Sequence, residues 1–185
     1  KNSIMDTTLT IASAQSYVGH TDRVWSLDVC AGTLVTGGGD CQIKLWDVVS
    51  GQCTHSINAK DGSAVVSVQL VGQDLYYAAD KQIFLHTVGG NQTVPASVPC
   101  SLQPLALCME VCGPLIYIGY GDCVIRVWKD GICKGRYQGH VGEVRCFPAQ
   151  GHQLLTSAGF LFPDQVLELV EWQLIGGEVY VVDWR

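Results

Sequence analysis

GTLVTGGGDCQIKLWD (Gly32 to Asp47) recurs in altered form as GPLIYIGYGDCVIRVWK (Gly113 to Lys129). Both stretches contain an apolar run, a glycine-rich turn with an aspartate, and a second apolar run that ends in tryptophan. The two tryptophans, Trp46 and Trp128, are 82 positions apart in a chain of 185 residues, which is two units of about 40. We therefore expect an array of similar structural units.

The residues around the first copy predict four short strands. The β-rich runs lie at 24–29, 33–36, 42–46 and 53–57. Residues 37–40 provide a tight turn before the third run. Gly-His pairs end at His20 and His140, which are 120 positions apart, or three units. Four antiparallel strands in a unit of about 40 residues, opened by Gly-His and closed by Trp-Asp, are typical of a β-propeller blade.

At named positions the chain resembles the WD40-repeat family. His20, Thr36, Asp40 and Trp46 match that family's structural hydrogen-bond tetrad, and the first unit alone has all four. The resemblance implies that the histidine bridges the aspartate and the threonine, and that the hydroxyl reaches the indole. It also implies the fold class, all-β, with a WD40-type β-propeller of which about four four-stranded antiparallel blades are visible as a partial ring.

We place the repeats at about 19–58, 61–98, 104–138 and 139–184, and expect residues 1–18 to form the outer strand of a preceding blade. The chain starts with Lys1 inside a repeat. Propellers have 4 to 8 blades, and members of the family that this chain resembles usually have about seven. We therefore expect a fragment or truncated isoform of a larger protein.

The second and third units depart from the pattern. In the second, Asp80 keeps the turn position and His86 stands in the place of the tryptophan. In the third, Asp122 and Trp128 are kept, but Ile118 stands in the place of the threonine. The tetrad cannot close there, so we expect the third blade to rely on apolar packing.

The fourth unit opens with His140 and keeps Thr156. Residues 160–165 are then an insertion, followed by predicted strands at 166–172 and 179–182. The alternative is that everything after Gly159 is an unrelated tail.

Composition excludes some classes of partner. A net charge of −6 with 11 Lys and Arg makes nucleic-acid binding unlikely. The sequence has no apolar run of 18 residues and no signal-peptide pattern, so we predict no membrane contact.

The nine cysteines mostly follow the repeat. The equivalent pairs are Cys30 with Cys112, Cys41 with Cys123, and Cys53 with Cys133. A disulfide framework would not be expected to follow the repeat period, so we predict reduced thiols in a cytoplasmic or nuclear protein. The spacing of close ligand pairs such as CxxC is missing, so we predict no metal and no cofactor.

Thr36, His20 and Asp40 carry the three groups of a nucleophilic triad, but a hydroxyl held by an indole between strands favours a structural role. The glycines at 37–39 are followed by neither GKS nor GKT, so they do not predict a phosphate site. We therefore predict that the chain is not an enzyme.

Partner-binding residues are expected on the innermost strands. There, Arg23, Trp25, Glu143 and Arg145 flank the first apolar positions, and Trp and Arg are the commonest interface anchors. We predict a noncatalytic scaffold that binds proteins or peptides, including acidic or phosphorylated segments. The alternatives are a substrate-receptor module of a ubiquitin ligase and, with less support, an RNA-associated propeller.

Overall fold

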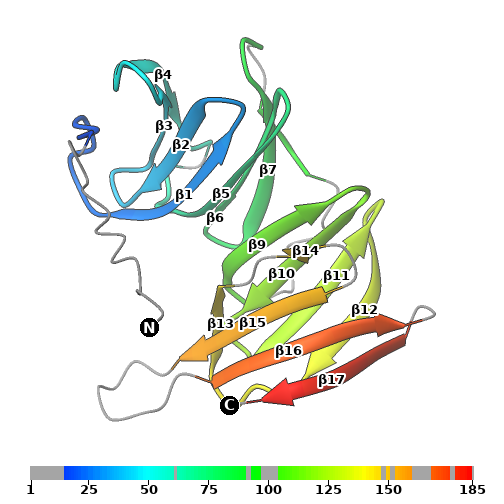
Figure 1. Ribbon diagram of the computed structural model, residues 1–185. Coiled ribbons are helices and arrows are strands. Elements are labelled where there is room, and N and C mark those ends of the chain that lie inside the picture. Colours follow the sequence, from blue (N-terminus) through cyan, green and yellow to red (C-terminus); the bar gives the residue numbers. More distant parts are fainter. Residues whose placement is uncertain are drawn as a thin grey trace, which may run out of the picture.

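In a computed structural model, the described residues are 15–60, 62–90, 93–96, 104–146, 149–150, 153–159, 168–175 and 178–184. They form four antiparallel sheets that follow one another in chain order (Figure 1). The chain is therefore all-β, as the sequence predicts, and every sheet is built from consecutive strands.

The first sheet has the strand order β1 (Val24–Cys30), β2 (Thr33–Gly38), β3 (Gln42–Asp47) and β4 (Cys53–Asn58). The second comprises β5 (Val65–Val71), β6 (Asp74–Ala79), β7 (Gln82–Thr87) and β8 (Thr93–Pro95). The third comprises β9 (Ala106–Cys112), β10 (Leu115–Tyr120), β11 (Val124–Lys129) and β12 (Ile132–Gln138). The fourth comprises β13 (Glu143–Cys146), β14 (Ala149–Gln150), β15 (Gln153–Gly159), β16 (Glu168–Ile175) and β17 (Glu178–Trp184).

Strand register confirms that the four sheets are copies of one unit. Trp46 lies opposite Leu34, His86 opposite Leu75, Trp128 opposite Ile116 and Trp172 opposite Leu154. The histidine of the second unit therefore takes the tryptophan position. In the fourth sheet, β16 pairs with β15 and β17 with β16.

Several predicted boundaries are wrong. Gly37 and Gly38 belong to β2, and the turn that follows comprises residues 39–41. The strand predicted at 166–172 is β16, which extends to Ile175. The predicted insertion at 160–165 lies outside the described residues.

Residues 16–18 were expected in an outer strand, but residues 15–20 form none. Instead, the Tyr17 ring meets Trp46 edge-on at 5.9 Å, and the Tyr17 hydroxyl donates to the Val48 carbonyl oxygen at 3.2 Å. The segment therefore crosses the face of the first sheet. The predicted strand at 8–12 lies outside the described residues.

Three apolar cores lie between successive sheets. The first joins β2 and β3 to β5–β7, the second joins the second and third sheets, and the third joins the third sheet to β13. The close approach of successive sheets depends on a glycine at the same position of the first and third units. A Cβ on Gly37 would lie 2.6 Å from Val65, and one on Gly119 would lie 2.8 Å from Val144. Each glycine thus admits the first residues of the next inner strand.

Hydrogen bonds with a constant offset also join the inner strands. The Val68 amide donates to Ser26 Oγ at 3.1 Å, and the Met109 amide donates to Ser67 Oγ at 3.1 Å. Two residues further on, the Leu70 amide donates to Asp28 Oδ2 at 2.8 Å, and the Val111 amide donates to Gln69 Oε1. Each bond joins residues 42 positions apart. We call these four bonds the inner ladder.

The order β1, β5, β9, β13 of neighbouring inner strands is that of propeller blades, and we use the word blade for each sheet. Closure of the ring by contact between β1 and β13 is not seen among the described residues.

Candidate functional site

The tetrad residues of the first blade form one hydrogen-bonded chain. His20 Nδ1 lies 2.8 Å from Asp40 Oδ2, and His20 Nε2 lies 2.8 Å from Thr36 Oγ1. The Trp46 indole N–H donates to Thr36 Oγ1 at 2.8 Å. With the ring proton on Nδ1, His20 donates to Asp40, and Nε2 accepts the Thr36 hydroxyl proton.

Thr36, His20 and Asp40 carry the hydroxyl, imidazole and carboxylate of a nucleophilic triad, but a substrate could not reach the hydroxyl. Thr36 and Trp46 are both buried, and the Thr36 hydroxyl is also 3.4 Å from the Lys44 carbonyl oxygen. A nucleophile must reach a substrate, whereas this hydroxyl lies between β2 and β3 beneath residues 15–20. The geometry holds strands together and offers no reaction site.

Asp40 also fastens the turn. It accepts the Thr21 amide at 3.0 Å and the Gln42 amide at 3.2 Å. Burial alone would raise the pKa of Asp40, but the hydrogen bonds from Thr21, His20 and Gln42 together hold this pKa below its ordinary value. The carboxylate is therefore stabilised in its charged form.

In the third blade an arginine replaces the histidine. Both Arg126 terminal nitrogens donate to the Asp122 carboxylate, with Nη1 at 3.0 Å from Oδ1. The Arg126 guanidinium carbon lies 4.7 Å from the centre of the Tyr120 ring. Buried apolar side chains pack on both faces of this blade, as expected, and a bidentate ion pair and a cation–π contact also hold it.

Burial raises the pKa of Asp122, but the Arg126 hydrogen bond and charge outweigh it, so this pKa is lowered overall. The missing threonine has the predicted consequence at Trp128. Ile118 is fully buried opposite Arg126, and the buried Trp128 indole N–H has no acceptor among the described residues.

The second and fourth blades keep less of the tetrad. Asp80 is exposed, and its φ of 53° places it in the left-handed region at a two-residue turn. His86 is buried, and its Nδ1 lies 2.9 Å from Thr93 Oγ1. His140 is buried, while Thr156 lies in β15 opposite Val170, with its side chain outside the described residues.

Two of the four predicted partner-binding residues line a cavity of about 540 Å³ on the inner strands. Trp25 on β1 and Arg145 on β13 belong to its wall, together with residues of β5 and β9. Arg145 is also ion-paired with Glu143. Glu143 and Arg23 are not among the lining residues, so the structure does not bring Arg23 to this site. We call this space the channel cavity.

Sequence reasoning missed the polar lining of the channel cavity. Asp28, Gln69 and Glu110 line it from β1, β5 and β9, at 41-position intervals. Gln69 Nε2 donates to Glu110 Oε1 at 3.2 Å. The 41-residue spacing of Ser-Leu-Asp, Ser-Val-Gln and Cys-Met-Glu was the signal that could have found these residues.

Trp25 is the most exposed aromatic anchor of the site, at 53%. Its indole nitrogen would lie 3.1 Å from a Cβ on Gly39, and the Asp22 carboxylate would lie 2.8 Å from the same Cβ. Glycine at position 39 therefore lets the ring lie against the turn. Held in this way, the indole presents a large apolar surface at the cavity.

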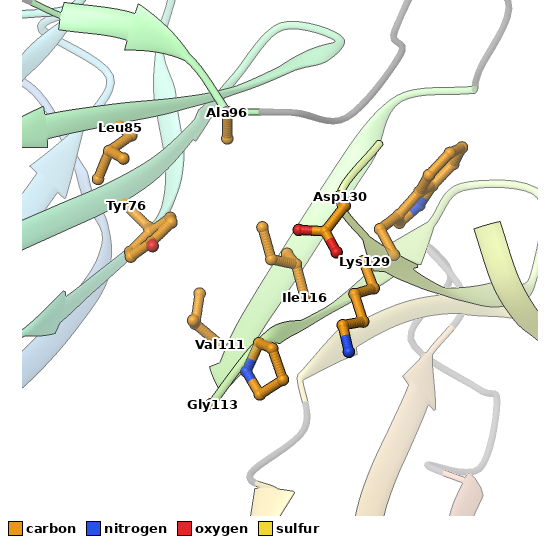
Figure 2. Close-up of a pocket in the computed structure, with 10 residues that line it drawn as sticks. Tyr76, Leu85, Ala96, Val111, Gly113, Ile116, Lys129 and Asp130 are labelled. Atoms are coloured by element: carbon orange, nitrogen blue, oxygen red, sulfur yellow. The ribbon is translucent and has the colours of Figure 1, made fainter. Parts of the chain in front are cut away.

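A smaller cavity of about 240 Å³ lies between the second and third blades. Figure 2 shows Tyr76, Leu85 and Ala96 on one side of it, and Ile116 with Lys129 and Asp130 on the other. Lys129 and Asp130 are exposed. The arrangement is a gap at a blade interface, and its buried lining is mainly apolar.

Among the described residues, no group of three or more His, Cys, Asp or Glu side chains is arranged to hold a metal ion. Nor do these residues include a helix of sufficient length and apolarity to cross a membrane.

Residues 12–47 match the family model described as "WD domain, G-beta repeat". This chain is a WD40-repeat protein. Eukaryotic translation initiation factor 3 subunit I of Drosophila mojavensis is 40% identical over 128 residues, which cover 61% of this WD40 chain and 40% of the relative. F-box/WD repeat-containing protein 2 of Mus musculus is 44% identical over 50 residues, covering 27% of the chain and 12% of the relative. The chain thus spans less than half the length of these relatives.

Solved structures agree on the fold. The computationally designed Ika4 protein aligns with 91% of this WD40 chain and 96% of its own, with a TM-score of 0.62 at 19% identity. The designed Ika8 protein gives the same TM-score over 90% of the chain and 63% of its own, at 17% identity. These likenesses show a shared architecture and carry no functional information.

Proposed function

We propose that this chain is a noncatalytic protein-interaction module that docks a segment of a partner protein at the channel cavity. The observation that carries the proposal is Trp25, an exposed indole held against Gly39 at the wall of a cavity that Arg145 also lines. Indole and guanidinium groups are enriched among residues that dominate binding energy at protein interfaces.

The relatives support the class of this function. The Drosophila mojavensis relative is named as a subunit of eukaryotic translation initiation factor 3, and the Mus musculus relative as an F-box/WD repeat-containing protein. The longer match, to the initiation-factor subunit, favours a subunit of a multiprotein assembly that works in the cytoplasm. The 50-residue match to the F-box protein supports the second candidate, a substrate receptor of a ubiquitin ligase.

The charged side chains that line the channel cavity indicate which kind of partner group binds there. Arg145 is already paired with Glu143, and the carboxylates of Asp28 and Glu110 line the same space. We therefore propose that Trp25 is the main anchor and receives an apolar or aromatic partner side chain. An acidic or phosphorylated group is a second contact, which must displace Glu143 from Arg145.

We also propose that the functional unit comprises blades at about 19–58, 61–98, 104–138 and 139–184. The tetrad and its equivalents (Asp80, Asp122, Trp128, His140 and Thr156) then stabilise the blades, and the inner strands bind the partner.

The test is affinity capture from cell extract with the full chain, followed by quantitative mass spectrometry. Trp25→Ala should reduce recovery of specific partners by about tenfold or more, as for a central interface anchor. Arg145→Glu should reduce it less. Ile132→Ala, at an exposed position on β12, is the matched control and should leave recovery unchanged. Equal recovery by wild type and Trp25→Ala, with unchanged thermal stability, would remove the proposed site. Enrichment of ubiquitin-ligase subunits in place of translation factors would support the second candidate.

A further inference from the structure

The cavity of about 240 Å³ between the second and third blades opens from the apolar core that joins them. Ala96, Val111 and Trp128 belong both to this core and to the cavity wall. Three further lining residues are half-buried at the margin of the same core: Tyr76, Leu85 and Ile116. We call this space the interblade cavity. Apolar cavities of about 150 Å³ bind a single aromatic ring, so the interblade cavity is large enough for an aromatic side chain.

In the first blade an aromatic side chain covers the equivalent tryptophan. Strand register aligns Trp46 with Trp128, and Leu34 with Ile116. The Tyr17 ring packs edge-on against Trp46, with the ring centres 5.9 Å apart. Trp128 and Ile116 instead border the interblade cavity. Since edge-on contact is a preferred geometry of aromatic pairs, the cavity wall offers a second ring the kind of surface that Tyr17 covers in the first blade.

The rim of the interblade cavity carries polar groups in the place where the Tyr17 hydroxyl is bound in the first blade. That hydroxyl donates to the carbonyl oxygen of Val48, two residues after the tryptophan, at 3.2 Å. The residue two positions after Trp128 is Asp130, which lines the interblade cavity together with Lys129 (Figure 2). Both of these charged residues are exposed. A phenol hydroxyl can donate to a carboxylate and accept from an ammonium group, so it suits either residue.

We propose that the interblade cavity binds a tyrosine side chain of a partner protein. The ring packs against Trp128 and Ile116, and the hydroxyl ends at the rim beside Lys129 and Asp130. The rim carries one charge of each sign, so a neutral hydroxyl meets no repulsion there, whereas an ionised group would repel one of the two.

This site is additional to the one proposed at the channel cavity. The two cavities have no lining residue in common. The channel cavity lies on the inner strands, whereas the interblade cavity is lined by β7, β10 and β11. Failure of one proposal therefore leaves the other standing, and each has its own experiment.

The direct test uses N-acetyl-tyrosine amide as a probe for a tyrosine residue. It is titrated into the full chain, and NMR records the Leu85 and Ile116 methyl groups and the Trp128 indole proton. These signals should shift and saturate with a dissociation constant on the order of 1 mM, as for a ligand of so few atoms. N-acetyl-phenylalanine amide is the matched control ligand and should bind about fivefold more weakly, because it lacks the hydroxyl.

Three outcomes of the titration would overturn the proposal. The first is the absence of saturable shifts at these three residues. The second is equal binding of the two amides, which would show that the hydroxyl makes no contact at the rim. The third is binding of free p-cresol without binding of N-acetyl-tyrosine amide, because the cavity would then admit a small phenol but not a residue of a chain.

A variant that fills the cavity tests the place of binding. Ile116→Trp should abolish the shifts, because the larger side chain occupies the space of the ring. Val71→Trp, at an exposed position on β5 outside the cavity, is the matched control and should leave the dissociation constant unchanged. The Val68 and Met109 amides of the inner ladder should stay protected from exchange in both variants if the blades still pack. Unchanged binding by a folded Ile116→Trp would overturn the proposal.

A variant of the first blade tests the comparison on which the proposal depends. Tyr17→Ala removes the ring that packs on Trp46, so N-acetyl-tyrosine amide should then shift the Trp46 indole proton as well as that of Trp128. Tyr17→Phe keeps the ring and should give no shift at Trp46. Binding beside Trp46 in Tyr17→Ala, with none beside Trp128, would show that only the first blade can hold a tyrosine, and the proposal would fail.

Discussion

The first and third blades share a turn aspartate and a strand-ending tryptophan, but different residues hold these two side chains. In both, the aspartate accepts the amide two residues on, at 3.2 Å in Asp40 and 3.3 Å in Asp122. In the first blade the cationic or polar partner is His20, from a segment outside the sheet. In the third it is Arg126, from the adjacent strand of the same hairpin.

This difference shows that the aspartate has two separable tasks. Its role in the turn is local and survives in both blades. In the first blade its second contact, with His20, joins the segment of residues 15–20 to the sheet. In the third blade its second contact, with Arg126, stays within one hairpin. The same residue position can therefore be kept while its structural consequence changes from long-range to local.

Trp46→Ala should produce the largest loss of stability and tests the difference between the first and third blades most directly. Removing this buried indole should cost about 3–5 kcal/mol of the free energy of unfolding, as for other large buried aromatics. Trp128→Ala should cost less, because its indole N–H makes no hydrogen bond among the described residues that could be lost. Urea unfolding followed by circular dichroism measures both. Val49→Ala, at an exposed position, should change the free energy by less than about 0.5 kcal/mol. Equal losses for the two tryptophans would show that the tetrad bond adds nothing.

Replacing the aspartates should produce the next largest effects. Asp40→Ala leaves the His20 ring and the Thr21 amide without their acceptor and should cost about 2–3 kcal/mol. Asp122→Ala should cost a similar amount, about 3 kcal/mol, because it leaves the charge of Arg126, whose side chain is only 10% exposed, without its partner. Urea unfolding at low and high salt measures both, and salt should change the Asp122 effect more than the Asp40 effect, because the Asp122 side chain is 34% exposed. A loss below about 1 kcal/mol at Asp122 would show that the ion pair contributes little to the third blade.

Ile118→Thr should sharpen the comparison with a smaller change. The new hydroxyl gives the Trp128 indole N–H an acceptor, while lost apolar burial offsets that gain, so stability should fall by less than about 1 kcal/mol. The decisive measurement is exchange of the Trp128 indole proton, which should slow. Ile118→Val is the control that removes carbon without adding a hydroxyl. Identical indole exchange in the two variants would show that the hydroxyl does not reach the ring.

The smallest expected effect is a dependence of stability on pH that comes from His86. Burial, together with the charge of His55, lowers the pKa of His86 below its ordinary 6.5. The unfolded chain then binds more protons than the folded chain below that pH, so this residue's stabilising contribution is present above about pH 6.5 and is lost as pH falls through the lower folded pKa. Unfolding curves across pH 5 to 8 should therefore have a steeper slope in the wild type than in His86→Phe. Parallel curves would show that His86 titrates as an ordinary exposed histidine.

Much of the fold could be predicted from particular residues. The Trp46 and Trp128 repeat predicted the sheets, and the position of His86 predicted its register, because alternation along a strand fixes which face a residue takes. The third blade was harder. Nothing local marked Arg126 as the partner of Asp122, since an arginine on a strand is usually solvated. The place of residues 15–20 depended on packing against Trp46, which periodicity does not encode.

Some residues of the candidate site could also be predicted from the sequence, and others could not. Trp25 and Arg145 were named from their positions on inner strands, and both line the channel cavity. Arg23 was named by the same rule, yet it is not among the lining residues, because the bulge after Val24 alters the strict alternation at the start of β1.

By itself the sequence determined the repeat, the order of strands and the residues of the first tetrad, because each depends on spacing along one chain. The tertiary structure alone decided which side chains of one blade bond the amides of the next. Those contacts join residues 42 positions apart, and their donors are backbone groups that every residue type except proline carries. Only the relative placement of the blades could show them.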